Sequence, residues 1–195
     1  MKVVIIKYNA GNIQSVDFAL QRIGAEAIVT DNIEEIKSAD KVIFPGVGEA
    51  SSAMQYLNEA GLTTVIKNLS QPVLGICLGM QLMCKFSEEG NTDCLGIFDD
   101  KVMKFASSFE YKVPQVGWNT ITNLKSPLFK NVKENEYMYF VHSYYVPPSE
   151  SAIATTNYTI NYSSALQKNN FYGVQFHPEK SSKAGEQILK NFLQL

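Results

Sequence analysis

The sequence predicts an α/β protein in three layers, with helices flanking a central sheet that is mixed but mostly parallel. Its first part alternates short apolar runs with segments of helical spacing. Strands separated by helices pair in parallel through right-handed crossovers. From Gly96 onward, shorter β-rich segments with Pro and Asn turns follow, which makes the sheet mixed. An amphipathic pattern over 183–193 predicts a closing helix.

In the first part, apolar runs bounded by turns predict the strands, and a spacing of three to four residues predicts the helices. The expected strands lie at 3–7, 27–30, 41–44 and in the run that leads to Cys77. The expected helices lie at 13–23, 33–38 and 50–69. Asn12 is the expected cap of the first helix and Gly24 its end, while Gly61 interrupts the third.

In the second part, runs rich in aromatic and β-branched residues predict short strands. They lie at 101–105, 118–121, 137–141, 152–156, 164–167 and 171–176. No repeat, low-complexity tract or linker interrupts the chain. We therefore expect one domain over 1–195.

Composition is consistent with this fold and argues against several functions. With 195 residues and 45% hydrophobic content, the chain can bury one sizeable core. The net charge of −2, with both signs interspersed, predicts neither a nucleic-acid surface nor a membrane-docking stripe. The amino-terminal apolar run is too short for a signal peptide, and no stretch approaches a membrane span. The three cysteines, at 77, 84 and 94, form no CxxC pair, so we expect neither a disulfide scaffold nor a zinc site. We expect the chain to be located in the cytoplasm, where thiols stay reduced.

Cys77 is the most informative residue. A short apolar strand runs into Gly75-Ile76-Cys77-Leu78-Gly79 and continues as an amphipathic helix. This is the nucleophile-elbow pattern with cysteine in place of serine. The turn is crowded, so a Cβ at either flanking glycine would clash with neighbouring backbone, and the start of a helix favours a thiolate. The alternative is that Cys77 is a small buried apolar residue.

The chain offers two histidines as a base for this thiol. His177 ends an aromatic-rich strand, and Glu179 follows two residues later. In an extended segment these two side chains point to the same side, so the carboxylate can orient the imidazole. His142 has no carboxylate within four residues and is interpreted as a packing or substrate-shaping residue.

Pro45-Gly46-Val47-Gly48 follows the third expected strand. The last glycine of a dinucleotide fingerprint would fall at Ser51, so that interpretation fails. The segment is either a plain turn or part of an oxyanion hole, which needs two preorganised N–H donors. The Leu78 amide, next after the nucleophile, is one natural donor.

These residues carry a family resemblance. The run from Gly75 to Gln81, together with His177-Pro178-Glu179, resembles the class I (triad) glutamine amidotransferases. Further segments are similar to one branch, the glutaminase subunits of imidazole glycerol phosphate synthase. They lie at 2–12, 45–48, 87–90, 117–119, 139–145 and 177–181. The resemblance covers nearly the whole chain in the expected order.

The resemblance implies hydrolysis of glutamine to glutamate and ammonia through a thioester on Cys77, with His177 as base and then acid and Glu179 orienting it. It makes the Val47 amide the second oxyanion donor, presented only after the loop flips. The implied glutamine-binding residues are Gly46, Gly48, Gln81, Glu89, Ser143 and Tyr144. Gln81 lies one helical turn after Cys77, and Glu89 is expected near the end of that helix. Without the resemblance, Glu89 would be an ordinary solvated charge.

The resemblance also implies a partner, a separate cyclase subunit of (β/α)8-barrel type that uses the ammonia in histidine biosynthesis as part of a heterodimer. It implies no metal and no organic cofactor. The implied interface residues are Asn12, Trp118, Tyr139 and Lys180. By default Trp118 would be a core or interface residue and Lys180 a solvated lysine.

Three residues depart from the family pattern. Lys7 and Asn9 stand where an Asp and a Gly are expected, and Gln115 stands where a histidine is usual. All three lie in segments associated with the partner side. Two alternatives therefore stay open: a paralogue that supplies ammonia to a sugar-amidating ligase, and a non-catalytic binding subunit. The intact Cys77, His177 and Glu179 argue against the second.

Overall fold

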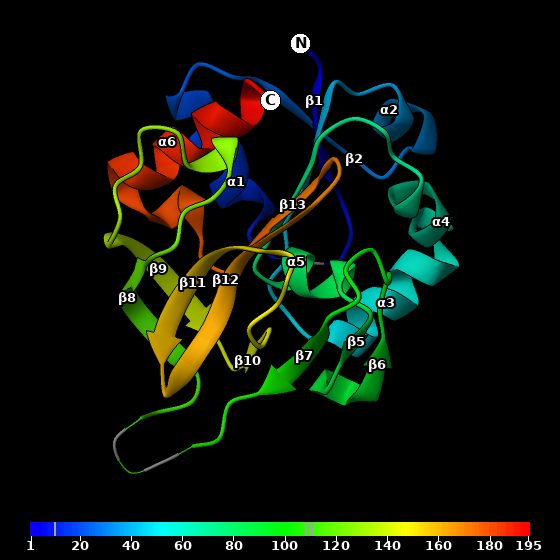
Figure 1. Cartoon of the computed structure of the whole chain (residues 1–195). Coiled ribbons are helices and arrows are strands. Elements are labelled where there is room, and N and C mark those ends of the chain that lie inside the picture. Colours follow the sequence, from blue (N-terminus) through cyan, green and yellow to red (C-terminus); the bar gives the residue numbers. More distant parts are fainter. Residues whose placement is uncertain (10, 108, 110) are drawn as a thin grey trace.

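The computed structural model describes residues 1–9, 11–107, 109 and 111–195. A seven-stranded sheet runs through its centre in the order β11-β12-β13-β4-β3-β1-β2 (Figure 1). Its strands are β1 (Val3–Ile6), β2 (Ala27–Thr30), β3 (Lys41–Phe44), β4 (Val73–Ile76), β11 (Ala152–Tyr158), β12 (Ile160–Lys168) and β13 (Phe171–Val174). The neighbours from β13 to β2 pair in parallel, whereas β12 pairs antiparallel with both β11 and β13. The expected mixed, mostly parallel sheet is confirmed.

Helices and a two-stranded ribbon cover the sheet. The helices are α1 (Ile13–Arg22), α2 (Ile33–Lys37), α3 (Ala50–Glu59), α4 (Leu62–Lys67), α5 (Leu78–Met83) and α6 (Ser182–Leu193). One core cluster joins the sheet to α2, α3, α4 and α5. The other joins it to α1, α6 and the ribbon of β8 (Gln115–Ile121) and β9 (Glu136–His142). Together these clusters give the three expected layers.

A smaller four-stranded sheet has the order β10-β7-β5-β6. Its strands are β5 (Phe86–Ser87), β6 (Thr92–Asp93), β7 (Lys101–Lys104) and β10 (Tyr144–Tyr145). Three 3-10 turns complete the description: η1 (Glu89–Asn91), η2 (Pro127–Phe129) and η3 (Pro178–Lys180). The pairing of β10 with β7 brings residues after 143 beside the end of α5, close to the elbow.

The sequence signals explain several boundaries. Gly61 takes a positive φ of 69° between α3 and α4, which confirms the expected interruption. Gly24, with φ 78°, follows the end of α1. Asn12 is the N-cap residue of α1, but its side chain makes no capping hydrogen bond. Its amide is used elsewhere, as described below.

The topology of the sheet indicates where a ligand would bind. In an open α/β sheet, ligands bind beyond the carboxyl ends of the strands. Here β3 ends before Pro45, β4 ends before Cys77 and β13 ends before Gln175. Because β4 lies between β3 and β13, the elbow is flanked by both connections.

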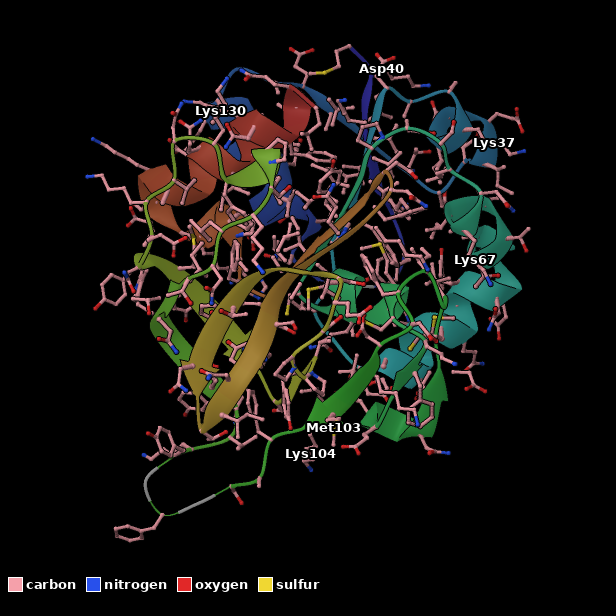
Figure 2. All side chains as sticks on the ribbon, viewed as in Figure 1. Lys37, Asp40, Lys67, Met103, Lys104 and Lys130 are labelled. Carbon is pink, nitrogen blue, oxygen red and sulfur yellow. The ribbon has the colours of Figure 1, made fainter. Side chains whose placement is uncertain are left out.

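The outside of the molecule carries the charged side chains. Figure 2 shows Lys37, Lys67, Lys104 and Lys130 at the periphery, and all four are exposed. The longest helix among the described residues, α6, has 12 residues, and no helix of this part of the chain could cross a bilayer.

Candidate active site

The elbow residue Cys77 is held in an unusual backbone conformation. It lies between β4 and α5 with φ 54° and ψ −110°, where non-glycine residues are rarely found. Its amide donates to the Val174 carbonyl at 2.8 Å. A Cβ at Gly79 would collide with the Phe44 carbonyl, and one at Gly75 would lie 2.8 Å from the Met80 amide nitrogen. The crowding expected at the two glycines is therefore present.

His177 and Glu179 lie side by side next to the elbow. The Nδ1 atom of His177 is 2.7 Å from Oε1 of Glu179, and both side chains are buried. The expected pairing is present, but the expected reason was wrong. His177 itself is extended, whereas η3 (Pro178–Lys180) is a 3-10 turn, and the backbone N–H of Lys180 donates to the His177 carbonyl at 3.0 Å. A tight turn, and not strand alternation, brings the carboxylate back to the imidazole.

The electrostatics of this pair favour a protonated imidazole. Burial acts to lower the pKa of His177, but the charge and hydrogen bond of Cys77, and those of Glu179, outweigh it and raise the pKa to about 10. Among the described residues, Oε2 of Glu179 is buried without a hydrogen-bond partner.

Asn12 belongs to this cluster. Its Nδ2 donates to Oε1 of Glu179 at 2.5 Å and lies 3.3 Å from Nδ1 of His177. The sequence predicts Asn12 at the partner interface, and it is half-buried here. Arg22 of α1 donates to the Glu179 backbone carbonyl at 3.2 Å. Helix α1 therefore supports Glu179 through both its ends.

A cavity of about 320 Å³ opens in front of the sulfur. It is lined by Val47, Gly48, Cys77, Leu78, Gln81, Glu89, Pro114, Val141, His142, Ser143, Tyr144, His177 and Lys180. The structure thus brings most of the sequence-predicted site residues to one hollow. Gly46 and Glu179 lie behind this lining and are buried. The sequence analysis assigned no role to Pro114 or Val141, although Val141 lies in the family-like segment 139–145.

Gln81 is fixed by two acceptors. Its Nε2 donates to the Tyr144 carbonyl at 3.0 Å and to Oε1 of Gln175 at 2.8 Å. Both amide hydrogens are thereby used, so the carbonyl oxygen of Gln81 is the group left for a ligand. Gln81 can therefore accept a hydrogen bond from a bound molecule.

Glu89 reaches the same cavity from an unexpected element. The sequence places it near the end of the helix after Cys77, but α5 ends at Met83 and Glu89 begins η1. Its Oε2 accepts the Ala50 amide at 2.9 Å, at the start of α3. Partial burial raises the pKa of Glu89 despite that bond. A carboxylate that faces a cavity in this way suits a bound ammonium group.

His142 lines the cavity as a neutral group. Its Nδ1 donates to the Tyr144 carbonyl at 2.6 Å, and its Nε2 lies 3.3 Å from the Tyr162 hydroxyl. Burial lowers the pKa of His142 to about 4. The Tyr162 hydroxyl also donates to Oε1 of Gln115 at 3.1 Å. A histidine with this low pKa makes a poor base, which agrees with the packing interpretation.

The two predicted oxyanion donors are not presented together. The Leu78 amide donates to the Gly46 carbonyl at 3.2 Å. That carbonyl belongs to the same peptide unit as the Val47 N–H. Because a trans peptide places its carbonyl and N–H on opposite sides, the Val47 N–H points away from Leu78. The Tyr8 hydroxyl donates to the Pro45 carbonyl at 2.6 Å and anchors the preceding peptide.

Of the remaining predicted interface residues, Lys180 lines the cavity, whereas Trp118 and Tyr139 lie on the β8–β9 ribbon. Trp118 is 52% exposed on β8, and its ring meets that of Tyr139 on β9 edge-on with centroids 5.9 Å apart. Lys180 is exposed and lines the cavity. Of the three departures from the family pattern, Lys7 and Asn9 are exposed, whereas Gln115 is buried. The described residues contain no cluster of His, Cys, Asp and Glu that could hold a metal.

Comparison with known proteins agrees with this geometry. A family model described as glutamine amidotransferase class-I matches residues 4–195. A solved structure described as a glutamine amidotransferase has a TM-score of 0.76 at 17% identity, covering 98% of this chain and 97% of that one. The structure of PurLQS from Thermotoga maritima has a TM-score of 0.74 at 13% identity, covering 99% and 97%. These two likenesses show the fold, a class I glutamine amidotransferase fold.

Curated relatives narrow the class. The imidazole glycerol phosphate synthase subunit HisH of Bacteroides fragilis is 64% identical over the full length of both chains. The HisH subunit of Haemophilus influenzae is 48% identical, covering 100% of this chain and 98% of its own. The chain therefore belongs to the class I glutamine amidotransferase family, within the group of HisH subunits of imidazole glycerol phosphate synthase.

Proposed function

We propose that this chain is the glutaminase subunit of an imidazole glycerol phosphate synthase and that Cys77, His177 and Glu179 carry the reaction. One observation supports this above the others. The elbow sulfur and the His177–Glu179 pair meet at one cavity, at the carboxyl end of the sheet. A thiol, a base and an orienting carboxylate are the groups that nucleophilic catalysis on an amide needs.

The reaction starts at the thiol. The Cys77 proton passes to His177, and the thiolate attacks the side-chain carboxamide carbon of glutamine. The C–N bond of the resulting tetrahedral species breaks as His177 returns the proton to the leaving nitrogen, which departs as ammonia. Water, deprotonated by His177, then attacks the γ-glutamyl thioester; the C–S bond breaks, glutamate is released and His177 returns the proton to the Cys77 sulfur. Glu179 orients the imidazole and stabilises its charged form, with Asn12 donating to that carboxylate.

The substrate has a complementary set of groups in the cavity. Glu89 receives the α-ammonium group of glutamine, and the carbonyl oxygen of Gln81 accepts an N–H from the substrate. Backbone groups of Gly46, Gly48, Ser143 and Tyr144 hold its carboxylate and carboxamide.

The oxyanion hole forms by rotation of one peptide. In the present conformation the Leu78 N–H donates to the Gly46 carbonyl and is therefore not free to bind an oxyanion. Rotating the Gly46–Val47 peptide turns the Val47 N–H toward the sulfur and frees the Leu78 N–H, so that both donors face the developing oxyanion. The present conformation is then a resting state of this loop.

The ammonia is used by a partner. The names of the relatives and the family resemblance support a heterodimer with a HisF-like cyclase subunit of (β/α)8-barrel type, in histidine biosynthesis in the cytoplasm. The cyclase uses the ammonia to make imidazole glycerol phosphate and releases AICAR as the second product. Trp118, Tyr139 and Lys180 contribute to the surface it covers.

The test combines both subunits. Cys77→Ala removes glutamine-dependent product formation by at least about 10³-fold, because triad members act as a unit. The same complex still forms product from added ammonium salts, since the thiolate releases ammonia and does not consume it. Product formation with glutamine and with ammonium is measured in parallel. His142→Ala serves as the matched histidine control, which retains the covalent step, whereas His177→Ala does not. Unaltered glutamine use by folded Cys77→Ala protein contradicts the proposal.

A further inference from the structure

A buried glutamine outside the predicted triad touches the nucleophile. Gln175 is fully buried directly after β13, and its Nε2 lies 3.6 Å from Sγ of Cys77. Its backbone N–H donates to the Ser164 carbonyl at 2.9 Å, and the carbonyl of its predecessor, Val174, accepts the Cys77 N–H. The backbone around Gln175 is therefore fixed to the neighbouring strand on one side and to the elbow on the other.

The orientation of the Gln175 amide follows from its neighbours. A backbone carbonyl can only accept, so the Gln81 atom 3.0 Å from the Tyr144 carbonyl is its nitrogen. The same nitrogen is 2.8 Å from the side chain of Gln175, so that end of Gln175 is its oxygen. The other end, which faces the sulfur, is consequently the NH₂ group. Gln175 can only donate to Cys77.

We propose that Gln175 is a further catalytic residue, which donates a hydrogen bond to the Cys77 sulfur and stabilises it as a thiolate. The proposal rests on the proposed glutaminase function. A donor stabilises an anionic acceptor more than a neutral one. When the S–H bond breaks, the electron pair stays on sulfur and the proton goes to His177, while Gln175 keeps both of its own hydrogens.

The Gln175 side-chain amide also couples the nucleophile to the substrate pocket. Its Oε1 accepts a hydrogen bond from Nε2 of Gln81, and Oε1 of Gln81 is the group left for the substrate. One side chain thus fixes the position of the sulfur donor and of a substrate acceptor together. Because Gln175 is buried at the bottom of the site, it does so without touching solvent.

Other ionisable groups around the sulfur are left intact by a change at Gln175. They are His177, His142, Glu89, Lys180, Tyr8 and Tyr162. Burial raises the pKa of Tyr8 and of Tyr162, so both phenols stay neutral near neutral pH. A difference between wild type and a Gln175 variant then reports the missing donor.

The test is the pH dependence of Cys77 alkylation by iodoacetamide, followed by mass spectrometry of the Cys77 peptide because Cys84 and Cys94 are also free thiols. Gln175→Met keeps the length of the side chain and removes the donor. We expect this variant to have a pH midpoint of Cys77 alkylation about one pH unit higher than wild type, which is a roughly tenfold loss of Cys77 thiolate below the midpoint. Gln175→Glu keeps an oxygen for Gln81 and adds a negative charge, which shifts the midpoint at least as far.

Gln167→Met is the matched control. Gln167 lies on β12, half-buried, and its amide bonds to Ser126 and Tyr172 instead of Cys77. In the Gln167→Met variant, the pH midpoint of Cys77 alkylation stays at the wild-type value. If Gln175→Met fails to fold, the Gln175→Glu variant decides alone.

Two outcomes would overturn the proposal. One is a wild-type midpoint in the folded Gln175 variants. The other is a raised KM for glutamine with an unchanged midpoint, which would reduce Gln175 to a support of Gln81. Failure of the proposed function is distinguishable, because it shows as absent glutamate release by the wild-type complex, whatever the alkylation profile.

Discussion

At the scale of single residues, the site combines one histidine that is easily protonated with another that is hard to protonate. The pKa of His177 is raised to about 10 and that of His142 is lowered to about 4. Both side chains are buried and both line the same cavity. The difference is one of partners. The pKa of His177 is raised by Cys77 and by Glu179, whereas burial lowers the pKa of His142, which donates to a neutral carbonyl. Only His177 is suited to hold the thiol proton.

The buried neutral His142 makes stability depend on pH. Unfolded, it binds a proton near its ordinary pKa of 6.5, but folded only near about 4, so acid favours the unfolded chain in this window. Between about pH 7 and pH 5, wild type should lose about 2 kcal/mol more unfolding free energy than His142→Asn. Asparagine keeps a donor for the Tyr144 carbonyl. Urea unfolding at both pH values measures the difference.

His177 acts in the opposite direction. With its folded pKa raised, it contributes stability that is present below about pH 6.5 and lost as pH rises toward about 10. This contribution is common to wild type and His142→Asn and cancels in the comparison. Equal pH dependence in the two proteins would show that folding does not lower the pKa of His142.

At the residue level, the sequence indicated which side chains lie together where a local motif exists. The elbow around Cys77 and the His177–Glu179 pair are encoded within a few neighbouring residues, and the structure places them together. Gln175 was not identified, because its contact with Cys77 depends on the pairing of β13 with β4, two strands about 100 residues apart in the chain. Asn12 was assigned to the interface through the family resemblance, and its bond to Glu179, which spans 167 positions, has no local signal in the sequence.

At the scale of elements, the connection after β3 is the proposed switch. The Tyr8 hydroxyl holds the Pro45 carbonyl, so the Gly46–Val47 peptide can rotate while its predecessor stays in place. Gly48, with φ 132°, absorbs the backbone change in a conformation that favours glycine. The bond from the Leu78 amide to the Gly46 carbonyl is the contact that must break.

This switch predicts a dependence on the partner. The chain alone should hydrolyse glutamine slowly, and addition of the cyclase with its nucleotide ligand should raise turnover by about 10²-fold or more, the value of an oxyanion donor. Glutamate release is measured with and without the partner, with Cys77→Ala as the background control. Full activity of the purified chain alone would refute the gating, though not the chemistry.

Element boundaries show what the sequence leaves open. The expected strands at 118–121 and 164–167 are parts of longer strands, β8 (Gln115–Ile121) and β12 (Ile160–Lys168). Their additional residues are stabilised by cross-strand pairing with β9 and β11, which local pattern does not reveal. Glu89 was placed on the wrong element because α5 is only six residues long and ends at Met83.

At the scale of the whole molecule, the β8–β9 ribbon presents two different faces. Its inner face carries buried residues such as Met138 and Phe140. Its outer face, called here the β8–β9 face, carries Val116, Trp118, Tyr137, Tyr139 and Val141. Trp118 pairs with Tyr139, and Val116 with Val141. Aromatic residues exposed on a sheet next to an active site are typical of a protein interface.

We expect the cyclase to cover this face. Trp118→Ala should weaken cyclase binding by about tenfold or more, as removal of a buried aromatic anchor does. Titration of the cyclase, followed through glutamine-dependent product formation, measures it. Ile28→Ala, which changes a residue 42% exposed on the edge strand β2, is the matched control and should bind normally. Equal affinity of both variants and wild type would place the interface elsewhere.

Lys180 connects this surface to the cavity. It is exposed, lines the cavity and follows Glu179 directly. The fold class was predictable from the alternation of strands and helices. The interface role expected for Lys180 and Trp118 rests on the family resemblance alone, because an exposed lysine or tryptophan carries no local signal of its partner.

In the proposed reaction Cys77 takes the γ-glutamyl group of glutamine. To test this step, this chain and its cyclase are mixed with glutamine and quenched in acid, and the modification is located by peptide mass spectrometry. We expect a γ-glutamyl adduct on the Cys77 peptide, absent from Cys77→Ala protein and from the Cys84 and Cys94 peptides. Steady glutamate release with no adduct on Cys77, or equal release by Cys77→Ala, would contradict it.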